Sequence, residues 1–259
     1  GTGQGLVEVV TTAVRGHQDG YVTGADPPVE LLLPVLLPQA LLAKRRAIRL
    51  EPAAGPLSGK VGNVAGEPLR LLLLGESTVA GVGVDCQQQA LAGQCAEQLA
   101  EQLQRPVSWQ ALGENGITAA QALERLLPQV ASQRFDLVLL VFGVNDTTHF
   151  SSRQRWQAAL EGLARAFSAT DCKVAFTAVP PIQHFSALPW LLRKVLGWRA
   201  TLLDQQLAEV AGRLSAGHCQ VMLEFAPEYM ARDGYHPSAL GYQVWAQSLS
   251  NLLVERFRR

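Results

Sequence analysis

The stretch LRLLLLGEST, residues 69–78, decides the fold of this chain. A short apolar run that stops at a glycine, here Gly75, is typical of a buried strand, because glycine interrupts regular structure and the run is too short for a helix. Ser77 follows two residues later. The stretch therefore predicts a strand with a serine just beyond its carboxyl end.

Similar apolar runs recur along the chain and alternate with longer segments of helical period. This alternation is typical of βαβ units, whose right-handed crossovers place helices on both faces of a parallel sheet. We therefore expect a three-layer α/β/α sandwich of the flavodoxin-like type, with a five-stranded parallel sheet and functional loops at the carboxyl ends of its strands. The expected strands are residues 69–74, 107–112, 137–142, 173–179 and 220–224, and the expected helices are residues 87–104, 119–127, 153–167, 191–214 and 239–257.

The composition is that of a globular protein. Of the 259 residues, 48% are hydrophobic and 17% are charged, and the formal net charge is zero. This balance excludes disorder and provides no basic field for a phosphate backbone, so we expect no nucleic-acid partner. The absence of a CxxC pair predicts reduced thiols and leaves a disulfide without support. The four cysteines are Cys86, Cys95, Cys172 and Cys219.

The sequence before residue 69 differs from the rest. Residues 1–28 are polar and glycine-rich and are predicted to be a leader outside the fold. Residues 51–67 are rich in proline and glycine and are predicted to be a linker. We therefore expect an N-terminal leader and apolar helical appendage at residues 1–68, followed by one main domain at residues 69–259.

An apolar segment at residues 29–43 contains Pro34 and Pro38 and is followed by three basic residues. It is too short to span a bilayer comfortably, and its charges follow the apolar run, whereas in a secretory signal they precede it. Two interpretations stay open: a helix lying on the domain, or an interfacial membrane segment formed by residues 29–46. Both favour a cytoplasmic or peripherally membrane-associated protein over a secreted one.

Two motifs follow predicted strands, where open α/β sheets bind ligands. In GEST, residues 75–78, Ser77 can present its hydroxyl beside backbone N–H groups that face an oxyanion, or it can cap a helix. In GVND, residues 143–146, Asn145 supplies an amide donor, and a turn in which Asp146 caps the next helix is an equal alternative. Each motif by itself is ambiguous.

The third motif is DGYHP, residues 233–237, in the loop before the last predicted helix. A carboxylate three residues before a histidine can accept a hydrogen bond from one ring nitrogen and leave the other facing a serine. Asp233, His236 and Ser77 would then act as orienting acid, base and nucleophile. No second His or Cys lies at ligand spacing near this motif, so we expect no metal site.

In their order along the chain, these motifs resemble the blocks of the SGNH (GDSL-like) hydrolase superfamily. GEST resembles the Gly-Asp-Ser-Leu block, with Glu76 and Thr78 as departures, and Gly116 within LGENGIT resembles the glycine block. Residues 143–146 resemble the GxND block, and residues 233–236 resemble the DxxH block. The resemblance covers the chain from residue 69 to the C-terminus.

The resemblance implies an esterase or lipase in which Ser77 is the nucleophile, His236 the base and Asp233 the acid that orients it. It also implies an oxyanion hole made by the backbone N–H groups of Ser77 and Gly116 and by the side-chain amide of Asn145. The implied two-step acyl transfer uses no metal ion and no cofactor.

The segment after the fourth predicted strand is the richest apolar stretch near the expected site. We expect it to form an acyl-binding wall or lid, with an ordinary amphipathic helix packed on the sheet as an equal alternative. The candidate substrate-binding residues are Glu76, His184, Phe185 and Trp190.

We therefore expect a serine esterase that hydrolyses carboxylic esters of short to medium acyl chains, with a small-molecule or lipid ester as substrate. A thioesterase, a lysophospholipase or a carbohydrate acetylesterase would use the same groups. A non-catalytic membrane-associated module is a further alternative, but it predicts an incomplete set of catalytic residues, and none is missing here. The sequence leaves the oligomeric state open.

Overall fold

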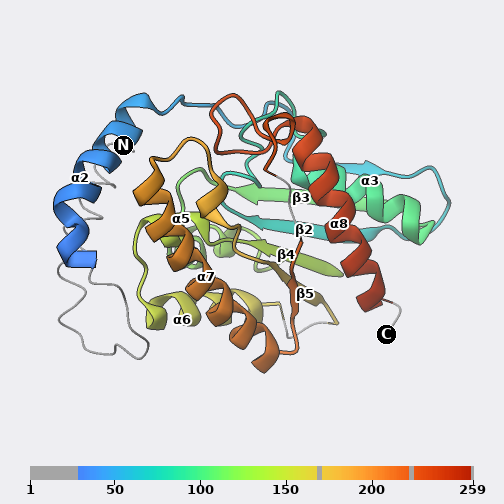
Figure 1. Ribbon diagram of the computed structural model, residues 1–259. Helices are drawn as coiled ribbons and strands as arrows, with labels where there is room; N and C mark the ends of the chain where they lie inside the picture. The colour runs from blue at the N-terminus through green and yellow to red at the C-terminus, as the bar shows by residue number, and fades with distance from the viewer. Residues whose placement is uncertain (1–28, 168–170, 222–224, 258–259) are drawn as a thin grey trace.

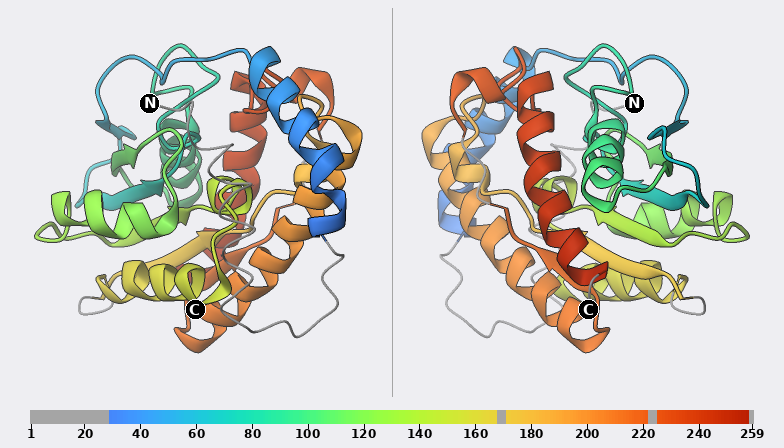
Figure 2. Two further views of the ribbon diagram at one scale, coloured as in Figure 1. Left: turned by 90° about the vertical axis from the view of Figure 1, so that its left-hand side faces the viewer. Right: turned by 90° about the vertical axis from the view of Figure 1, so that its right-hand side faces the viewer.

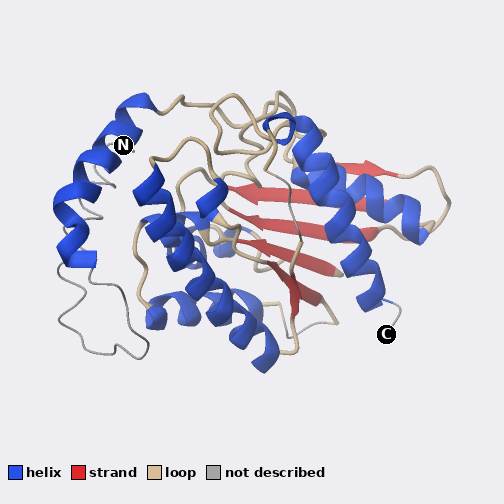
Figure 3. Cartoon of the chain, in the orientation of Figure 1, coloured by secondary structure: helices blue, strands red, loops and turns tan. Residues whose placement is uncertain are grey.

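The computed structural model describes residues 29–167, 171–221 and 225–257, and it forms a three-layer α/β/α sandwich (Figures 1 and 3). The predicted fold class is confirmed, although the sheet has six strands and not five. Their order is β1-β3-β2-β4-β5-β6, and β1 alone runs antiparallel to its neighbour. The strands are β1 Ser58–Val61, β2 Leu69–Gly75, β3 Val107–Gly113, β4 Leu137–Val141, β5 Lys173–Thr177 and β6 Gly217–Cys219.

Helices cover both faces of this sheet (Figure 2). One apolar cluster joins α3 and α8 to the sheet, and a second joins α4, α6 and α7 to its other face. The helices are α2 Val29–Arg46, α3 Leu91–Leu103, α4 Ala119–Arg125, α5 Val144–Thr148, α6 Arg153–Arg165, α7 Trp190–Arg213 and α8 Ala239–Phe257. Short 3-10 turns are η1 Leu127–Gln129, η2 Ile182–His184 and η3 Pro227–Tyr229.

The leucines of β2 are divided between the two faces. Leu71 and Leu73 belong to the cluster under α3 and α8, whereas Leu72 and Leu74 belong to the cluster under α4, α6 and α7. All four are at most 1% exposed. Successive side chains of a strand point to opposite faces, so a strand covered on both faces needs apolar residues at every position. Burying each leucine contributes roughly 1.5–3 kcal/mol.

The order of the strands positions the site. β2 pairs in parallel with β3 on one side and with β4 on the other. The chain therefore leaves β2 for one neighbour and returns to the other, and the loops that follow β2, β3 and β4 meet at one edge. Such a reversal of strand order is where open α/β sheets bind their ligands.

The segment predicted to be a linker contributes a strand to the sheet. β1 pairs with β3 from Ser58↔Gln110 to Val61↔Val107. The linker prediction was wrong because β1 is short and exposed or half-exposed along its length, so it has no apolar pattern. The adjoining segment is also bound to the main domain, since the backbone N–H of Ala53 donates to the carbonyl of Ala80 at 3.2 Å.

The last parallel strand was predicted in the wrong place. β6 covers only Gly217–Cys219, and of the predicted strand 220–224 the described residues, Gln220 and Val221, lie outside it. Residues 222–224 are outside the described ranges. An edge strand of three residues that includes a glycine and a histidine has no β-propensity signal. The strand was therefore predicted at the more apolar residues that follow it.

The apolar N-terminal segment forms α2 despite Pro34 and Pro38. Leu36 and Ala40 are buried in the same cluster as α7, which agrees with a helix lying on the domain. None of the helices in the described ranges is both long and apolar enough to cross a membrane. The predicted leader, residues 1–28, lies outside the described residues.

Candidate active site

Ser77 stands in the turn that follows β2. The backbone N–H of Glu76 still bonds to Val141 of β4, at 3.1 Å, so the turn begins directly at the edge of the sheet. Ser77 is 7% exposed, and its hydroxyl lies 3.0 Å from Nε2 of His236. It does not cap a helix, because α3 begins only at Leu91. The alternative of a simple capping serine is therefore wrong.

His236 is held by Asp233. Its Nδ1 lies 2.7 Å from Oδ2 of Asp233, and the other carboxylate oxygen accepts the backbone N–H groups of Tyr235 and His236, each at 3.0 Å. Burial by itself raises the pKa of Asp233, but the hydrogen bonds from His236 and from the two backbone groups outweigh it and lower the pKa. The carboxylate is thus kept ionised, and it orients the ring so that Nε2 faces the serine.

Two of the predicted oxyanion donors have no acceptor within the described ranges. Within the described ranges, the N–H groups of Ser77 and Gly116 donate to no protein atom. Gly116 has φ of +85°, and a Cβ built there would meet nothing within 4 Å. Glycine suits this position because the backbone is left-handed and open to an approaching ligand. The two groups are therefore available to a negatively charged oxygen.

Asn145, the third predicted donor, is bound to Glu76. One carboxyl oxygen of Glu76 accepts the backbone N–H of Val144 at 3.1 Å. The other accepts the backbone N–H of Asn145 at 3.0 Å and its side-chain amide at 2.7 Å. Because an asparagine amide has two N–H groups, this contact leaves one of them for another acceptor.

Glu76 lines the cavity beside the serine, but both oxygens of its carboxyl group accept hydrogen bonds from the protein. The residue is 3% exposed. Burial raises its pKa from 4.5 to about 8, although the hydrogen bonds from Asn145 and Val144 lower it. The prediction that Glu76 binds substrate is therefore corrected: its oxygens position Asn145.

Asp146 also differs from its prediction. It caps not the following helix but α4, which precedes it in the chain, by accepting the backbone N–H of Ala119 at 2.9 Å. Its other oxygen accepts the hydroxyl of Ser151 at 2.6 Å. Burial raises the pKa of this carboxyl, against these hydrogen bonds. Asp146 therefore ties α5 to the start of α4, the helix that follows the loop with Gly116.

A cavity of about 190 Å³ lies beside Ser77 and His236. Its aromatic wall begins at Tyr235, whose ring centroid is 5.4 Å from that of His236, and continues through Phe185 at 4.9 Å from Tyr235 and Phe225 at 5.8 Å from Phe185. The remaining wall is mostly apolar. It includes Pro180, Tyr229, Met230, Pro237, Val244 and Trp245.

Only some of the predicted substrate-binding residues reach this cavity. Phe185 lines it and is 4% exposed. His184 does not line the cavity; its ring stacks on that of Phe225, with 5.5 Å between the ring centroids. Trp190 does not line the cavity either, and it is 64% exposed. Sequence analysis missed Phe225 and Trp245, which follow no motif and reach the site only through tertiary packing.

The cysteines and the other described histidines do not line this cavity. In the described part of the chain no three His, Cys, Asp or Glu side chains gather as metal ligands do, and the four cysteines are free thiols. His149 contacts the backbone oxygen of Asn145 at 2.8 Å, and His218 contacts Asp204 at 3.0 Å.

A family model described as the GDSL-like lipase/acylhydrolase family matches residues 73–244 of this chain. The match spans more than half of the chain and includes every motif of the site. The protein therefore belongs to this family of SGNH hydrolases, in which a serine nucleophile and a catalytic triad are typical. A search of curated proteins finds no match.

Solved structures of several hydrolases share the fold. A lipase/acylhydrolase from Enterococcus faecalis superposes with a TM-score of 0.56 at 21% identity, covering 73% of this chain and 96% of that one. The psychrotrophic esterase EstA from Pseudoalteromonas superposes with a TM-score of 0.56 at 18% identity, covering 73% of this chain and 99% of that one. The acetylxylan esterase Axe2 from Geobacillus stearothermophilus superposes with a TM-score of 0.54 at 15% identity, covering 73% of this chain and 95% of that one.

Proposed function

We propose that this protein hydrolyses carboxylic esters of short to medium acyl chains through an acyl-enzyme intermediate on Ser77. The observation that carries the proposal is the continuous hydrogen-bonded chain from the Ser77 hydroxyl through His236 to Asp233, at 3.0 and 2.7 Å. A hydroxyl, an imidazole and a carboxylate in this order form an activated nucleophile.

The first step is attack on the ester carbonyl. His236 Nε2 takes the Ser77 proton as the oxygen bonds to the carbonyl carbon, and the ionised Asp233 stabilises the imidazolium that forms. His236 then gives this proton to the departing alcohol, which leaves an acyl group on Ser77. In the second step the same imidazole activates water, which releases the acid and restores the serine.

The developing oxyanion has three donors. The free backbone N–H groups of Ser77 and Gly116 would bind it, together with the amide hydrogen of Asn145 that Glu76 does not use. Preorganised donors of this kind need no reorientation during the reaction, and each is worth roughly 3–4 kcal/mol by comparison with a measured donor in another hydrolase.

The cavity supports an acyl group of limited length. Its wall is aromatic and aliphatic, which suits a hydrocarbon chain better than a sugar ring. An apolar cavity of about 150 Å³ holds benzene in another protein, so about 190 Å³ suits roughly six to eight carbon atoms. These observations favour a simple ester or a lipid-derived ester over an acetylated carbohydrate.

Replacing the nucleophile tests the proposal. Ser77→Ala is expected to lower kcat for p-nitrophenyl butyrate by roughly 10⁴-fold or more, because the covalent path is removed. The exposed Ser132→Ala is the matched control and should retain full activity. A fluorophosphonate should label the wild-type protein at Ser77 and leave the variant unlabelled. Turnover that persists in Ser77→Ala would reject this serine as the nucleophile.

A series of p-nitrophenyl esters tests the acyl preference. Phe225→Ala enlarges the cavity and is expected to shift the optimum of kcat/KM toward longer acyl chains. Trp190→Ala, which changes a side chain outside the lining, should leave the profile unchanged. A preference for acetylated xylo-oligosaccharides, or for acyl thioesters over oxygen esters, would assign the site to the corresponding alternative substrate.

A further inference from the structure

The exposed residues of α2 between Pro34 and Leu42 are all apolar, which is unusual for a helix on a protein surface. Leu36 and Ala40 point to the domain and are 4% and 5% exposed. Val35, Leu41 and Leu42 point away from the domain and are 49%, 40% and 41% exposed. A surface helix normally turns polar residues outward. Here the exposed positions between Pro34 and Leu42 hold apolar residues, and the exposed Arg45 and Arg46 end the helix.

This apolar surface continues beyond α2. Ile48 follows the end of the helix and is 49% exposed. Trp190, the first residue of α7, is 64% exposed, and it stands close to α2 because the Leu192 N–H donates to the side-chain oxygen of Gln39 at 3.1 Å. Figure 2 shows α2 lying across the beginning of α7. We call the exposed residues of this region the α2 surface: Val35, Leu41, Leu42, Arg45, Arg46, Ile48, Arg49 and Trp190.

The charge of the α2 surface has a single sign. The chain as a whole has equal numbers of acidic and basic residues, 22 each. Residues 34–49, in contrast, contain Lys44, Arg45, Arg46 and Arg49 and no acidic residue. Residues 172–203, which include the start of α7, are also free of acidic residues. An apolar strip beside arginines, with an exposed tryptophan, is complementary to the boundary between anionic headgroups and acyl chains.

A second copy of the chain fits this surface less well. In a symmetric dimer the same patch meets itself, so the arginines of one copy would face a surface without acidic partners. Insertion across the bilayer is also disfavoured, since no described helix meets the requirements for a span. We therefore propose that the α2 surface docks on an anionic lipid bilayer, with α2 lying in the plane of the interface.

The location of α2 connects this docking to the site. α2 lies on the side of the molecule toward which the parallel strands point, where the loops of the site are also found (Figure 1). The start of α7, beside α2, follows the cavity-wall residues Pro180 and Phe185 in the chain. A docked molecule would thus hold its cavity near the bilayer. Docking itself does not depend on the proposed ester hydrolysis.

Vesicle co-sedimentation of the full chain tests the proposal. Wild-type protein should bind phosphatidylcholine vesicles weakly and bind more tightly when phosphatidylglycerol is added. Arg45→Gln with Arg46→Gln should weaken binding to the anionic vesicles by about fivefold for each arginine. Leu41→Gln with Leu42→Gln should weaken it by about tenfold or more, through the loss of apolar contact.

Matched control variants replace two basic or two apolar residues by glutamine outside the α2 surface. Lys60→Gln with Arg134→Gln, and Leu57→Gln with Val64→Gln, alter exposed residues outside the α2 surface and should bind like the wild type. All variants should keep the wild-type unfolding midpoint and the same hydrolysis of a soluble ester, because none contacts the site.

Three results would overturn the docking proposal: no binding to either vesicle, equal binding by the wild type and the α2 variants, or a dimer in light scattering that the leucine variants dissociate. An inactive protein that still binds anionic vesicles would contradict the ester hydrolase and leave the docking intact.

Discussion

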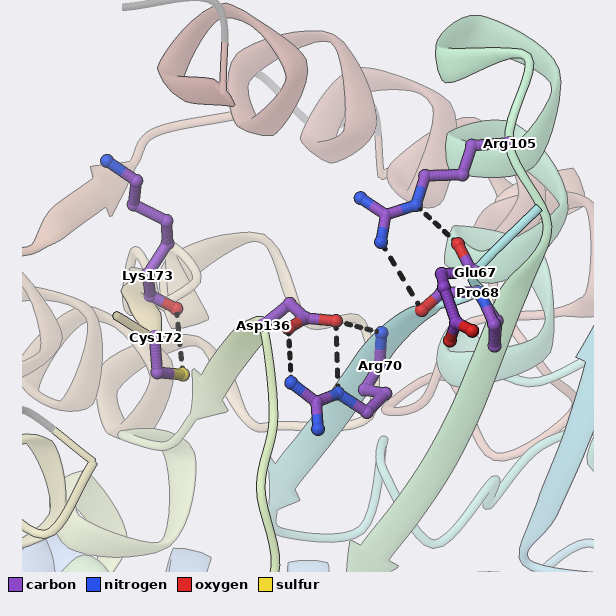
Figure 4. Close-up of polar contacts among 7 residues, drawn as sticks. All are labelled: Glu67, Pro68, Arg70, Arg105, Asp136, Cys172 and Lys173. Atoms are coloured by element: carbon purple, nitrogen blue, oxygen red, sulfur yellow. Dashed lines mark hydrogen bonds and ion pairs between the residues drawn. The ribbon is translucent and has the colours of Figure 1, made fainter. Parts of the chain in front are cut away.

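The two ends of the sheet hold similar polar groups, but these groups differ in how deeply they are buried. At the amino ends, Asp136 accepts the side chain of Arg70 at 2.6 and 3.2 Å and its backbone N–H at 2.7 Å (Figure 4). Arg105 beside it donates to the backbone oxygen of Glu67 at 2.7 Å. At the carboxyl ends, Asp233 is bound in the same way, yet the N–H groups of Ser77 and Gly116 stay free.

Burial also separates the two ends. The side chains of Arg70 and Asp136 are 47% and 27% exposed, whereas those of His236 and Asp233 are 12% and 5% exposed. Water screens the first pair, and its hydrogen bonds join the starts of β2 and β4. The second pair is shielded, so its charge acts on neighbouring groups. A polar cluster becomes reactive where burial and unused donors coincide, and the Arg70–Asp136 pair at the amino ends lacks the burial.

The largest expected effect is at Asp233. Asp233→Asn keeps an oxygen for the backbone N–H groups but no longer holds the imidazole in its required tautomer, and kcat should fall by about 10⁴-fold, as in serine proteases. Steady-state kinetics with p-nitrophenyl butyrate measures this loss, and thermal unfolding checks that the fold is retained. A loss below tenfold would mean that Asp233 does not orient the histidine.

Asn145→Ala removes a donor whose second hydrogen we assign to the oxyanion. We expect kcat to fall by roughly 10²- to 10³-fold with KM nearly unchanged, because the interaction strengthens only in the transition state. The exposed Asn63→Ala serves as the control. An increase in KM without a loss of kcat would assign Asn145 to substrate binding instead.

Glu76→Gln tests the buried carboxyl that positions Asn145. The folded-state pKa of about 8 lies above the ordinary glutamate value of 4.5, so between these pH values the unfolded chain releases this proton while the folded chain retains it. The free energy of unfolding of the wild type should therefore decrease from pH 4.5 to 8. Glutamine has no such proton, so the decrease should be smaller in the variant.

Urea unfolding at pH 5 and pH 8 measures this difference, with the exposed Glu67→Gln as control. The control should follow the wild type at both pH values. Parallel pH dependence in Glu76→Gln and the wild type would show that the Glu76 carboxyl does not retain its proton in the folded protein.

The smallest effect is expected at the amino ends. Asp136→Asn should leave ester hydrolysis unchanged and lower the unfolding midpoint slightly at pH 7. The hydrogen bond from Arg70 lowers the pKa of Asp136, so its contribution is complete above about pH 3.8 and is lost as the pH falls through the lowered value. The two midpoints should therefore converge in acid. A loss of activity in this variant would contradict the contrast between the two ends.

The central strands and the motif loops could be predicted because their signals are local. A strand segment covered by helices on both faces must be apolar at every position, so β4 and the four leucines of β2 stand out in the sequence as uninterrupted runs. Gly75 and Gly143 mark the ends of these runs, and the motif residues follow at once. The order of the motifs was then enough to indicate a hydrolase.

Other features left no local signal. β1 lies half-exposed at one edge of the sheet and β6 has three residues at the other, so their pairing depends on a neighbour that is already in place. The contacts of Glu76 with residues 144 and 145, and of Asp146 with Ala119, join loops far apart in the chain. No spacing rule predicts such pairs.

By itself, the sequence of this protein determined which residues are chemically capable and at which edge of the sheet they gather, because burial periodicity and strand-end turns are properties of short segments. Only the tertiary structure decided which backbone donors stay free, which carboxyl groups form hydrogen bonds within the protein and which aromatic side chains line the cavity. Those outcomes depend on desolvation and on distances between residues that are remote in the chain, and packing alone sets both.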